Sequence, residues 1–268
     1  MIHLKIRKDK RVICVNPKYE NISQWINESI DKFDNVGVLF SKRRNTLRIL
    51  TTNEGVCVIV KRYKLPGAIQ TIVYSFFRKS KASRAFIYSE YLLLNSIETP
   101  VPVAYVEEYH NWLFRYGYYM SLYKKRETCW ILNSDLSNQK LIYALALYIS
   151  RMHECGFLHG DVNLSNFLYE MIDGEYVICT VDTNRSKIIH NPTLHQCLAN
   201  LRRISHESEK IMSIVSEYAK IREWPVSYCV NFVLDEVKKL ERRKKIQNQF
   251  TISNVMNVIR RFLFSVNS

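Results

Sequence analysis

The sequence of 268 residues contains few glycines and prolines, no repeat and no segment of simple composition. Its seven glycines and six prolines are spread along the chain, and no unit recurs at periods of about 20 to 50 residues. Global disorder and repeat architectures are therefore excluded. Because 47% of the residues are hydrophobic, the chain can bury a substantial core, and we expect a compact globule of one or two domains.

No two cysteines have the C-x-x-C spacing of a zinc or redox site. The seven cysteines lie far apart, most of them inside apolar runs: Cys14, Cys57, Cys129, Cys155, Cys179, Cys197 and Cys229. An odd, scattered set predicts reduced thiols in a cytosolic compartment and not a disulfide framework.

Long apolar runs are also missing. The longest uncharged apolar segment, residues 141–149, is about half as long as a membrane span. Residues 1–10 alternate apolar and charged side chains, which is typical of a strand and not of a signal peptide. We therefore expect that no segment crosses a bilayer.

Acidic residues are too few to balance the basic ones. The 39 Lys and Arg against 25 Asp and Glu give a formal net charge of +14, which indicates an anionic partner. Nucleic acid, a phosphate-rich small molecule and an acidic lipid surface all fit, and the alternative is a charge excess that only keeps the protein soluble. The signature motifs of nucleic-acid-binding domains are absent, so we expect no nucleic-acid partner.

Hydrophobic periodicity predicts strands in the first half of the chain and helices in the second. The first half is expected to hold strands at 36–40, 46–51, 56–63, 103–107 and 113–123 and a helix at 83–95. A helix capped by Ser137 or Asn138, a hairpin turning at Asp173-Gly174 and a helical region at about 193–264 follow. We therefore predict an α+β fold, with an antiparallel-sheet lobe at 1–123 and a mainly helical lobe at 124–268.

A polar loop at residues 157–166 joins the central helix to this hairpin and carries Asp161 and Asn166, while Asp182 directly follows the hairpin. In phosphoryl-transfer sites, one Asp orients and deprotonates the acceptor hydroxyl, whereas an Asn and a second Asp hold magnesium against the phosphates. We therefore predict that Asp161 is the catalytic base and that Asn166 and Asp182 bind Mg²⁺.

The same kind of site needs a cation on the third strand of the sheet to bind phosphate oxygens of ATP, and a helical Glu to hold that cation. Lys61 and Glu90 occupy these places. Each residue alone is typical of a solvated charge, but the ordered set of five predicts a kinase with a protein-kinase-like, two-lobed fold. His159 is expected to bond the backbone around Asp182 and not to transfer protons.

The glycine-rich loop that covers the phosphates in most nucleotide kinases is missing. Residues 40–45, Phe-Ser-Lys-Arg-Arg-Asn, stand in its place. Ser, Asn and cationic side chains can cover phosphate, and a solvated charged turn is the alternative. A catalytically inactive pseudokinase or a basic binding module therefore stays open as an alternative function.

With these residues, the chain resembles the lipopolysaccharide core kinase family, distant relatives of protein kinases that phosphorylate Kdo or heptose in the inner core. The resemblance runs from about Thr46 to Tyr218, and it is carried by segments 77–85, 99–104, 152–156, 159–168 and 181–185. It implies ATP as the donor, a sugar of a lipopolysaccharide precursor as the acceptor, and a cytoplasmic enzyme peripheral to the anionic inner membrane.

Two departures from protein kinases favour a small acceptor. Gly160 stands where those enzymes have an Arg, so a pocket that reads a phosphorylated activation loop is missing. Only 86 residues (268 minus 182) follow Asp182, which leaves little room for a peptide-binding lobe. Kinases that act on aminoglycosides, choline or a protein remain alternatives.

Three basic stretches, at residues 78–81, 202–203 and 238–246, are expected to dock the chain on an anionic membrane leaflet. Solvated helix faces are the alternative. Arg78, Lys81 and Arg84 are further candidates for binding substrate phosphate.

Overall fold

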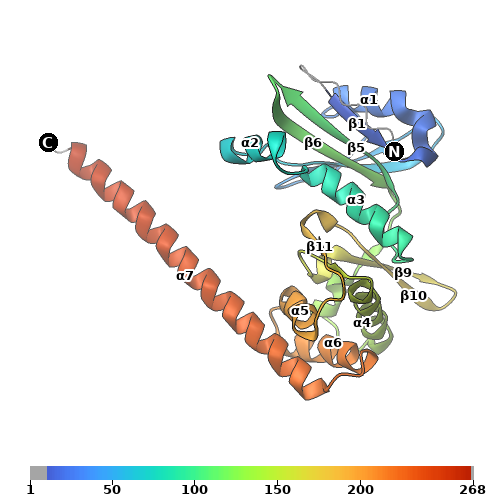
Figure 1. Cartoon of the computed structure of the whole chain (residues 1–268), viewed down its shortest axis with the longest axis vertical. Coiled ribbons are helices and arrows are strands. Elements are labelled where there is room, and N and C mark those ends of the chain that lie inside the picture. Colours follow the sequence, from blue (N-terminus) through green and yellow to red (C-terminus); the bar gives the residue numbers. More distant parts are fainter. Residues whose placement is uncertain (1–10, 267–268) are drawn as a thin grey trace.

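The computed structural model describes residues 11–266, and the side chains of residues 11–247. The strand expected at 1–10 lies outside the described residues. Figure 1 shows a sheet-rich lobe above a mainly helical lobe, with helix α7 projecting away from the lower one.

The upper lobe is built on a six-stranded antiparallel sheet with strand order β1-β5-β6-β4-β3-β2. Its strands are β1 (Arg11–Val15), β2 (Val38–Lys42), β3 (Thr46–Thr51), β4 (Cys57–Arg62), β5 (Pro102–His110) and β6 (Leu113–Leu122). Its helices are η1 (Pro17–Ile22), α1 (Ser23–Asp31), α2 (Ala68–Phe76) and α3 (Lys81–Leu94).

The two faces of this sheet have different surroundings. Successive side chains of a strand point to opposite faces, so Val58 and Val60 of β4 enter the core formed with α1, where they are fully buried. Ile59 and Lys61 point to the other face, the one that faces the lower lobe, and both line a cleft there. The position of Lys61 is therefore a consequence of strand periodicity.

The lower lobe packs its helices around the central α4. Its helices are η2 (Cys129–Asn133), α4 (Gln139–Glu154), η3 (Leu164–Asn166), η4 (Thr183–Arg185), α5 (Leu194–Asn200), η5 (Leu201–Arg203), α6 (Ser208–Ile221) and α7 (Val226–Val266). Its strands are β7 (Glu127–Thr128), β8 (Phe157–Leu158), β9 (Phe167–Ile172), β10 (Glu175–Thr180) and β11 (Lys187–Ile188).

Helix α4 has the cap and the buried face that its sequence predicts. The Asn138 side chain accepts a hydrogen bond of 3.0 Å from the backbone N–H of Leu141, which satisfies a free donor of the first turn. The periodic residues Leu141, Leu145, Tyr148 and Met152 are all buried. They anchor the helix in the main core of the lobe.

The predicted α+β arrangement, with its strand-rich front and helical back, is confirmed. Helices α1 and α2 were not predicted, and the sheet has six strands where about five were expected. The lobe boundary after residue 123 stays a prediction. Among the described residues, no helix has the length and apolar character that spanning a membrane requires.

Candidate active site

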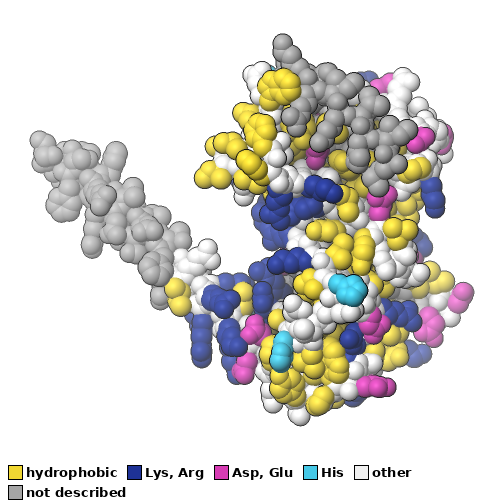
Figure 2. All heavy atoms as spheres, viewed as in Figure 1, with side chains coloured by type: hydrophobic (Ala, Val, Ile, Leu, Met, Phe, Trp, Pro, Cys, Tyr) yellow, Lys and Arg dark blue, Asp and Glu magenta, His cyan; other side chains and the backbone are white. Residues whose placement is uncertain are grey.

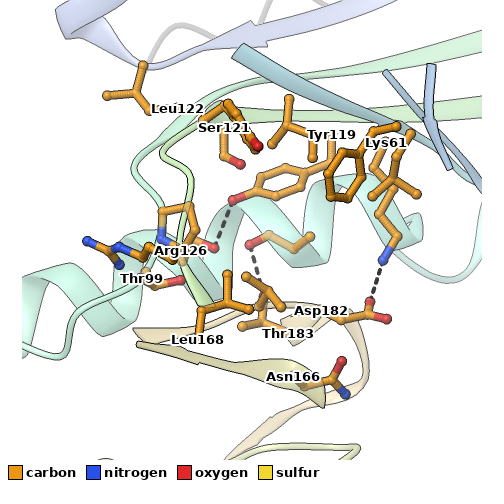
Figure 3. Close-up of a pocket in the computed structure, with 18 of the residues that line it drawn as sticks. Lys61, Thr99, Tyr119, Ser121, Leu122, Arg126, Asn166, Leu168, Asp182 and Thr183 are labelled. Atoms are coloured by element: carbon orange, nitrogen blue, oxygen red, sulfur yellow. Dashed lines mark hydrogen bonds and ion pairs between the residues drawn. The ribbon is translucent and has the colours of Figure 1, made fainter. Parts of the chain in front are cut away.

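A cleft of about 830 Å³ lies between the sheet and the lower lobe. Leu47 and Ile59 line it from the sheet, and Leu168 and Val181 line it from below. Figure 3 shows polar side chains of both lobes converging at the end of the cleft near Lys61. An apolar slot with charged groups at one end suits a ligand that has a flat ring and an anionic tail.

Lys61 and Asp182 connect the two lobes across this cleft (Figure 3). The Lys61 ammonium Nζ lies 2.7 Å from Oδ1 of Asp182, although 121 residues separate them in the sequence. Burial by itself would raise the pKa of Asp182, but the charge of Lys61 and its hydrogen bond outweigh burial, and the pKa lies below its ordinary value. Asp182 is therefore an anion at neutral pH.

The backbone of Asp182 has a conformation that is uncommon for a residue other than glycine. Its φ of 60° and ψ of 42° lie in the left-handed region, which Asp and Asn tolerate better than most residues. The Asn184 side-chain amide donates a hydrogen bond to Oδ1 of Asp182. This turn, placed directly after β10, directs the carboxylate into the cleft.

Asn166 lies below Asp182 and also lines the cleft. Its side-chain nitrogen donates a hydrogen bond of 2.9 Å to the backbone carbonyl of Asp161, and its amide oxygen points toward Asp182 (Figure 3). This amide oxygen and the second carboxylate oxygen of Asp182 are hard ligands, and magnesium commonly binds through one or two such protein groups together with substrate phosphates. The donor set therefore fits a magnesium ion.

His159 ties the loop that carries Asp161 to the strand that precedes Asp182. Its Nδ1 accepts the backbone N–H of Asp161 at 3.1 Å, so Nε2 carries the proton and donates it to the carbonyl of Val181 at 3.0 Å. The imidazole is fully buried, and burial lowers its pKa. The backbone-bonding role predicted for His159 is confirmed.

Arg203 lies against Asp161 and was not predicted as part of the site. Its Nη1 is 3.3 Å from Oδ1 of Asp161, and each side chain is more than a third exposed. Arg203 belongs to a basic stretch that was expected to dock on a membrane. Its contact with Asp161 was not predicted, because 42 residues separate the two and no spacing rule joins them. The turn η5 brings the two together.

Glu90 is not brought to Lys61, so the predicted pair is not formed. Helix α3 turns Ala85 and Ser89 toward the cleft, and the hydroxyls of Ser89 and Tyr119 share a hydrogen bond of 2.9 Å there. Glu90 is rotated by about 100° from Ser89 around the helix. It forms no hydrogen bond or ion pair within the described part of the chain, and burial raises its pKa.

Cationic side chains gather where a glycine-rich loop would lie. Arg43, Arg44 and Asn45, from the turn between β2 and β3, line the cleft. Burial lowers the pKa of Lys81, and the nearby charges of Arg44, Arg185 and Arg84 lower it further. Figure 2 shows Lys and Arg side chains gathered between the two lobes. We call Arg44, Lys81, Arg84 and Arg185 the cationic cluster.

Gly160 has a packing reason to be glycine. A β-carbon placed there would overlap the backbone carbonyl of Arg185 in η4, so no larger side chain fits. The turn η4, which follows Asp182, therefore packs directly against Gly160. This close approach holds the two predicted acidic site residues in a fixed relation to each other.

Residues 121–222 match the sequence model of the family described as lipopolysaccharide kinase (Kdo/WaaP). The predicted resemblance to this family is thereby confirmed for that part of the chain. The matched segment contains Asp161, Asn166 and Asp182, and it begins after Lys61 and Glu90. No curated protein matches the chain in sequence.

Among solved structures, the chain is similar to one titled "WaaP in complex with acyl carrier protein", with a TM-score of 0.58 and 11% identity over 87% of this chain and 98% of that one. This similarity confirms the predicted protein-kinase-like fold.

Two weaker similarities fall below a TM-score of 0.5. A Rio2 kinase complex from Chaetomium thermophilum has a TM-score of 0.44 and 13% identity over 83% of this chain and 75% of that one. Amicoumacin kinase hAmiN has a TM-score of 0.45 and 13% identity over 85% of this chain and 93% of that one.

Proposed function

We propose that this chain is an ATP-dependent kinase that phosphorylates a hydroxyl of Kdo or heptose in a lipopolysaccharide precursor. One observation carries the proposal. Lys61 of the upper lobe meets Asp182 of the lower lobe beside Asn166, at the charged end of a cleft. The match of residues 121–222 to the lipopolysaccharide kinase family supports the substrate class.

The nucleotide is proposed to enter the cleft with its base between Ile59 and Leu168 and its phosphates toward Lys61. Lys61 would then exchange part of its contact with Asp182 for phosphate oxygens. Asn166 and Asp182 would hold Mg²⁺, which when bound neutralises charge on the phosphates. The predicted role of Glu90 in holding Lys61 stays a proposal, because the two side chains are not paired in this structure.

Asp161 is proposed as the base that acts on the acceptor. The acceptor oxygen forms a bond to the γ-phosphorus while the bond from that phosphorus to ADP breaks, and the hydroxyl proton passes to the Asp161 carboxylate. Arg203 shields this carboxylate at 3.3 Å and is exposed enough to turn toward an anionic acceptor. The acceptor hydroxyl would therefore bind beside the Asp161 carboxylate, where the Arg203 guanidinium now lies.

The cationic cluster supports an acceptor that carries negative charge. Burial and the nearby charges of Arg44, Arg185 and Arg84 lower the pKa of Lys81, and an anion bound between these groups would offset the repulsion. Phosphate and carboxylate groups of a lipopolysaccharide precursor suit such a site. We further propose that the enzyme works in the cytoplasm at the inner face of the anionic inner membrane.

A panel of acceptors tests the proposal. The purified chain, labelled ATP and magnesium would be incubated separately with a Kdo-containing lipid A precursor, a heptose-containing core, an aminoglycoside, choline and a peptide. We expect label on one of the two sugar acceptors. Label on the peptide with none on either sugar would overturn the substrate assignment, and failure to bind magnesium-ATP in calorimetry would indicate a pseudokinase.

A further inference from the structure

Helix α2 presents a strongly exposed apolar stripe. Ile69, Ile72 and Phe76 follow one another at spacings of three and four, so they share one side of the helix. Their exposed fractions are 80%, 49% and 55%, and Phe77, directly after the helix, is 80% exposed. Large apolar side chains exposed together on one element mark an interaction surface.

The opposite side of α2 is firmly attached to the sheet. The Ser75 hydroxyl is buried and accepts the backbone N–H of Phe114 in β6 at 2.8 Å. The ring of Tyr74 packs edge-on against that of Phe114, with 5.6 Å between their centroids. The exposed stripe therefore belongs to a helix fixed to the lobe, and the described residues leave it uncovered.

Basic side chains flank the stripe at both ends. Lys64 precedes α2, Arg78 and Lys79 follow it, and all three are exposed. No acidic residue occurs between Glu54 and Glu90. Figure 2 shows the hydrophobic patch at the edge of the upper lobe, with Lys and Arg side chains next to it toward the cleft.

We propose that α2 is a membrane-docking helix whose apolar stripe enters the interface of an anionic bilayer. Apolar side chains bordered by cations are the pattern of interfacial helices, in which buried area and attraction to anionic headgroups add together. The cations at both ends of the stripe and the lack of acidic residues in the surrounding sequence suit an anionic bilayer as the occupant. The proposal extends the proposed function, since docking here would bring the cleft to a lipid-anchored acceptor.

Flotation of the full chain with vesicles tests this proposal. The vesicles would be phosphatidylethanolamine with phosphatidylglycerol, or neutral phosphatidylcholine. The variant Ile72→Gln/Phe76→Gln should bind the anionic vesicles at least about tenfold more weakly than the wild type, because two apolar side chains no longer leave water. The control Leu94→Gln/Met171→Gln changes two apolar residues that are more exposed than Ile72 and Phe76 and lie near the C-terminal ends of α3 and β9, and it should bind like the wild type.

The outcomes separate docking from catalysis. Equal binding by the wild type and the α2 variant, or no binding by either, would overturn the docking proposal. A wild-type dimer that becomes a monomer in the α2 variant, without vesicle binding, would make the stripe a contact between copies and overturn it too.

We expect the variant to phosphorylate a deacylated, water-soluble sugar acceptor normally and a vesicle-embedded one poorly. Vesicle binding without phosphorylation of any sugar would leave docking intact and remove only the kinase assignment.

Discussion

Asp182 experiences two opposing effects at the scale of single residues. Burial disfavours its charge, whereas the Lys61 ammonium, 2.7 Å away, favours it. The net lowering of its pKa keeps the carboxylate charged, and because Lys61 and Asn184 contact Oδ1, we expect Oδ2 to be the oxygen that binds a cation in the cleft. The ion pair across the cleft therefore holds charged groups where the charged part of a ligand is proposed to bind.

Replacing Asp182 with Asn should weaken binding of magnesium-ATP by about tenfold or more at limiting magnesium, because a neutral amide oxygen is a poorer ligand than a carboxylate. Calorimetric titration measures this affinity. Asp173→Asn is the matched control, since Asp173 also has a positive φ, of 50°, but lies in the β9–β10 turn. Unchanged nucleotide affinity in Asp182→Asn would contradict the role of Asp182.

Replacing Asp161 with Asn should lower turnover by about 10²–10⁴-fold, the usual contribution of a general base. Nucleotide affinity should stay at the wild-type value, because Asp161 faces Arg203 and is absent from the residues that line the cleft. Steady-state kinetics and calorimetry on the same preparation give both quantities. Wild-type turnover in this variant would end the assignment of Asp161 as the base.

Residue spacing predicted part of this site. Asp161, Asn166 and Asp182 lie on one loop and the hairpin after it, so local sequence order was enough to propose them together. Arg203 and Ser89 reach the site through the packing of η5 and α3, which no spacing rule encodes. Lys61 and Glu90 are not in contact in this structure, because strand and helix patterns fix positions along the chain but not the rotation of α3 about its axis.

At the scale of elements, the close contact between Gly160 and the turn η4 contributes to stability. Gly160→Ala should destabilise the fold by about 1–3 kcal/mol, because the methyl group must push the η4 backbone away at Arg185. Nucleotide affinity should fall as well, since η4 directly follows Asp182. Gly67→Ala is the control, because a β-carbon there meets no atom within 4 Å. Denaturant unfolding with equal midpoints for both variants would refute the packing argument.

His153 connects three helices of the lower lobe. Its Nε2 donates to Oδ1 of Asn200 in α5 at 3.1 Å, and its Nδ1 accepts from the hydroxyl of Tyr218 in α6 at 2.8 Å. The Asn200 amide nitrogen in turn donates to the carbonyl of His159 at 2.8 Å. The neutral imidazole in α4 is thus linked by hydrogen bonds to the loop that carries Asp161.

Stability should fall as the pH drops because of His153. Burial lowers its pKa to about 4 from an ordinary value of 6.5, so the unfolded chain binds a proton that the folded chain excludes. The stabilisation is complete above pH 6.5 and is lost progressively toward pH 4, by up to about 3 kcal/mol. The stability advantage of the wild type over His153→Gln should therefore shrink from pH 7 to pH 5 in denaturant unfolding. A constant difference would contradict this.

The elements that the sequence predicted are those with a clear period. Helix α4 buries one regular face over 16 residues. Helices α1 and α2 span only nine residues each, which is shorter than the window over which a helical period becomes clear. In α2, moreover, the apolar side with Ile69, Ile72 and Phe76 faces outward, whereas an apolar helix side is ordinarily assigned to a core. The same property makes α2 the docking surface proposed above.

At the scale of the whole molecule, the two lobes meet through apolar packing of Leu92 and Ile97 in the core of the lower lobe and through polar contacts around the cleft. The Thr99 hydroxyl donates to the carbonyl of Thr180 at 2.8 Å, and the Tyr148 hydroxyl donates to the carbonyl of Glu98 at 2.6 Å. Together with the Lys61–Asp182 pair, they hold a sheet and a helical lobe on either side of one ligand cleft. The two-lobed layout was predictable because strands and helices segregate along the sequence.

The central claim is that this cleft transfers phosphate from ATP to a sugar of a lipopolysaccharide precursor. Mass spectrometry of lipopolysaccharide from cells lacking the gene, complemented with the wild type or with Asp161→Asn, tests it most directly. We predict that the inner core loses the mass of one phosphoryl group without the gene, regains it with the wild type and does not regain it with the variant. Identical core masses in all of these cells would contradict the account.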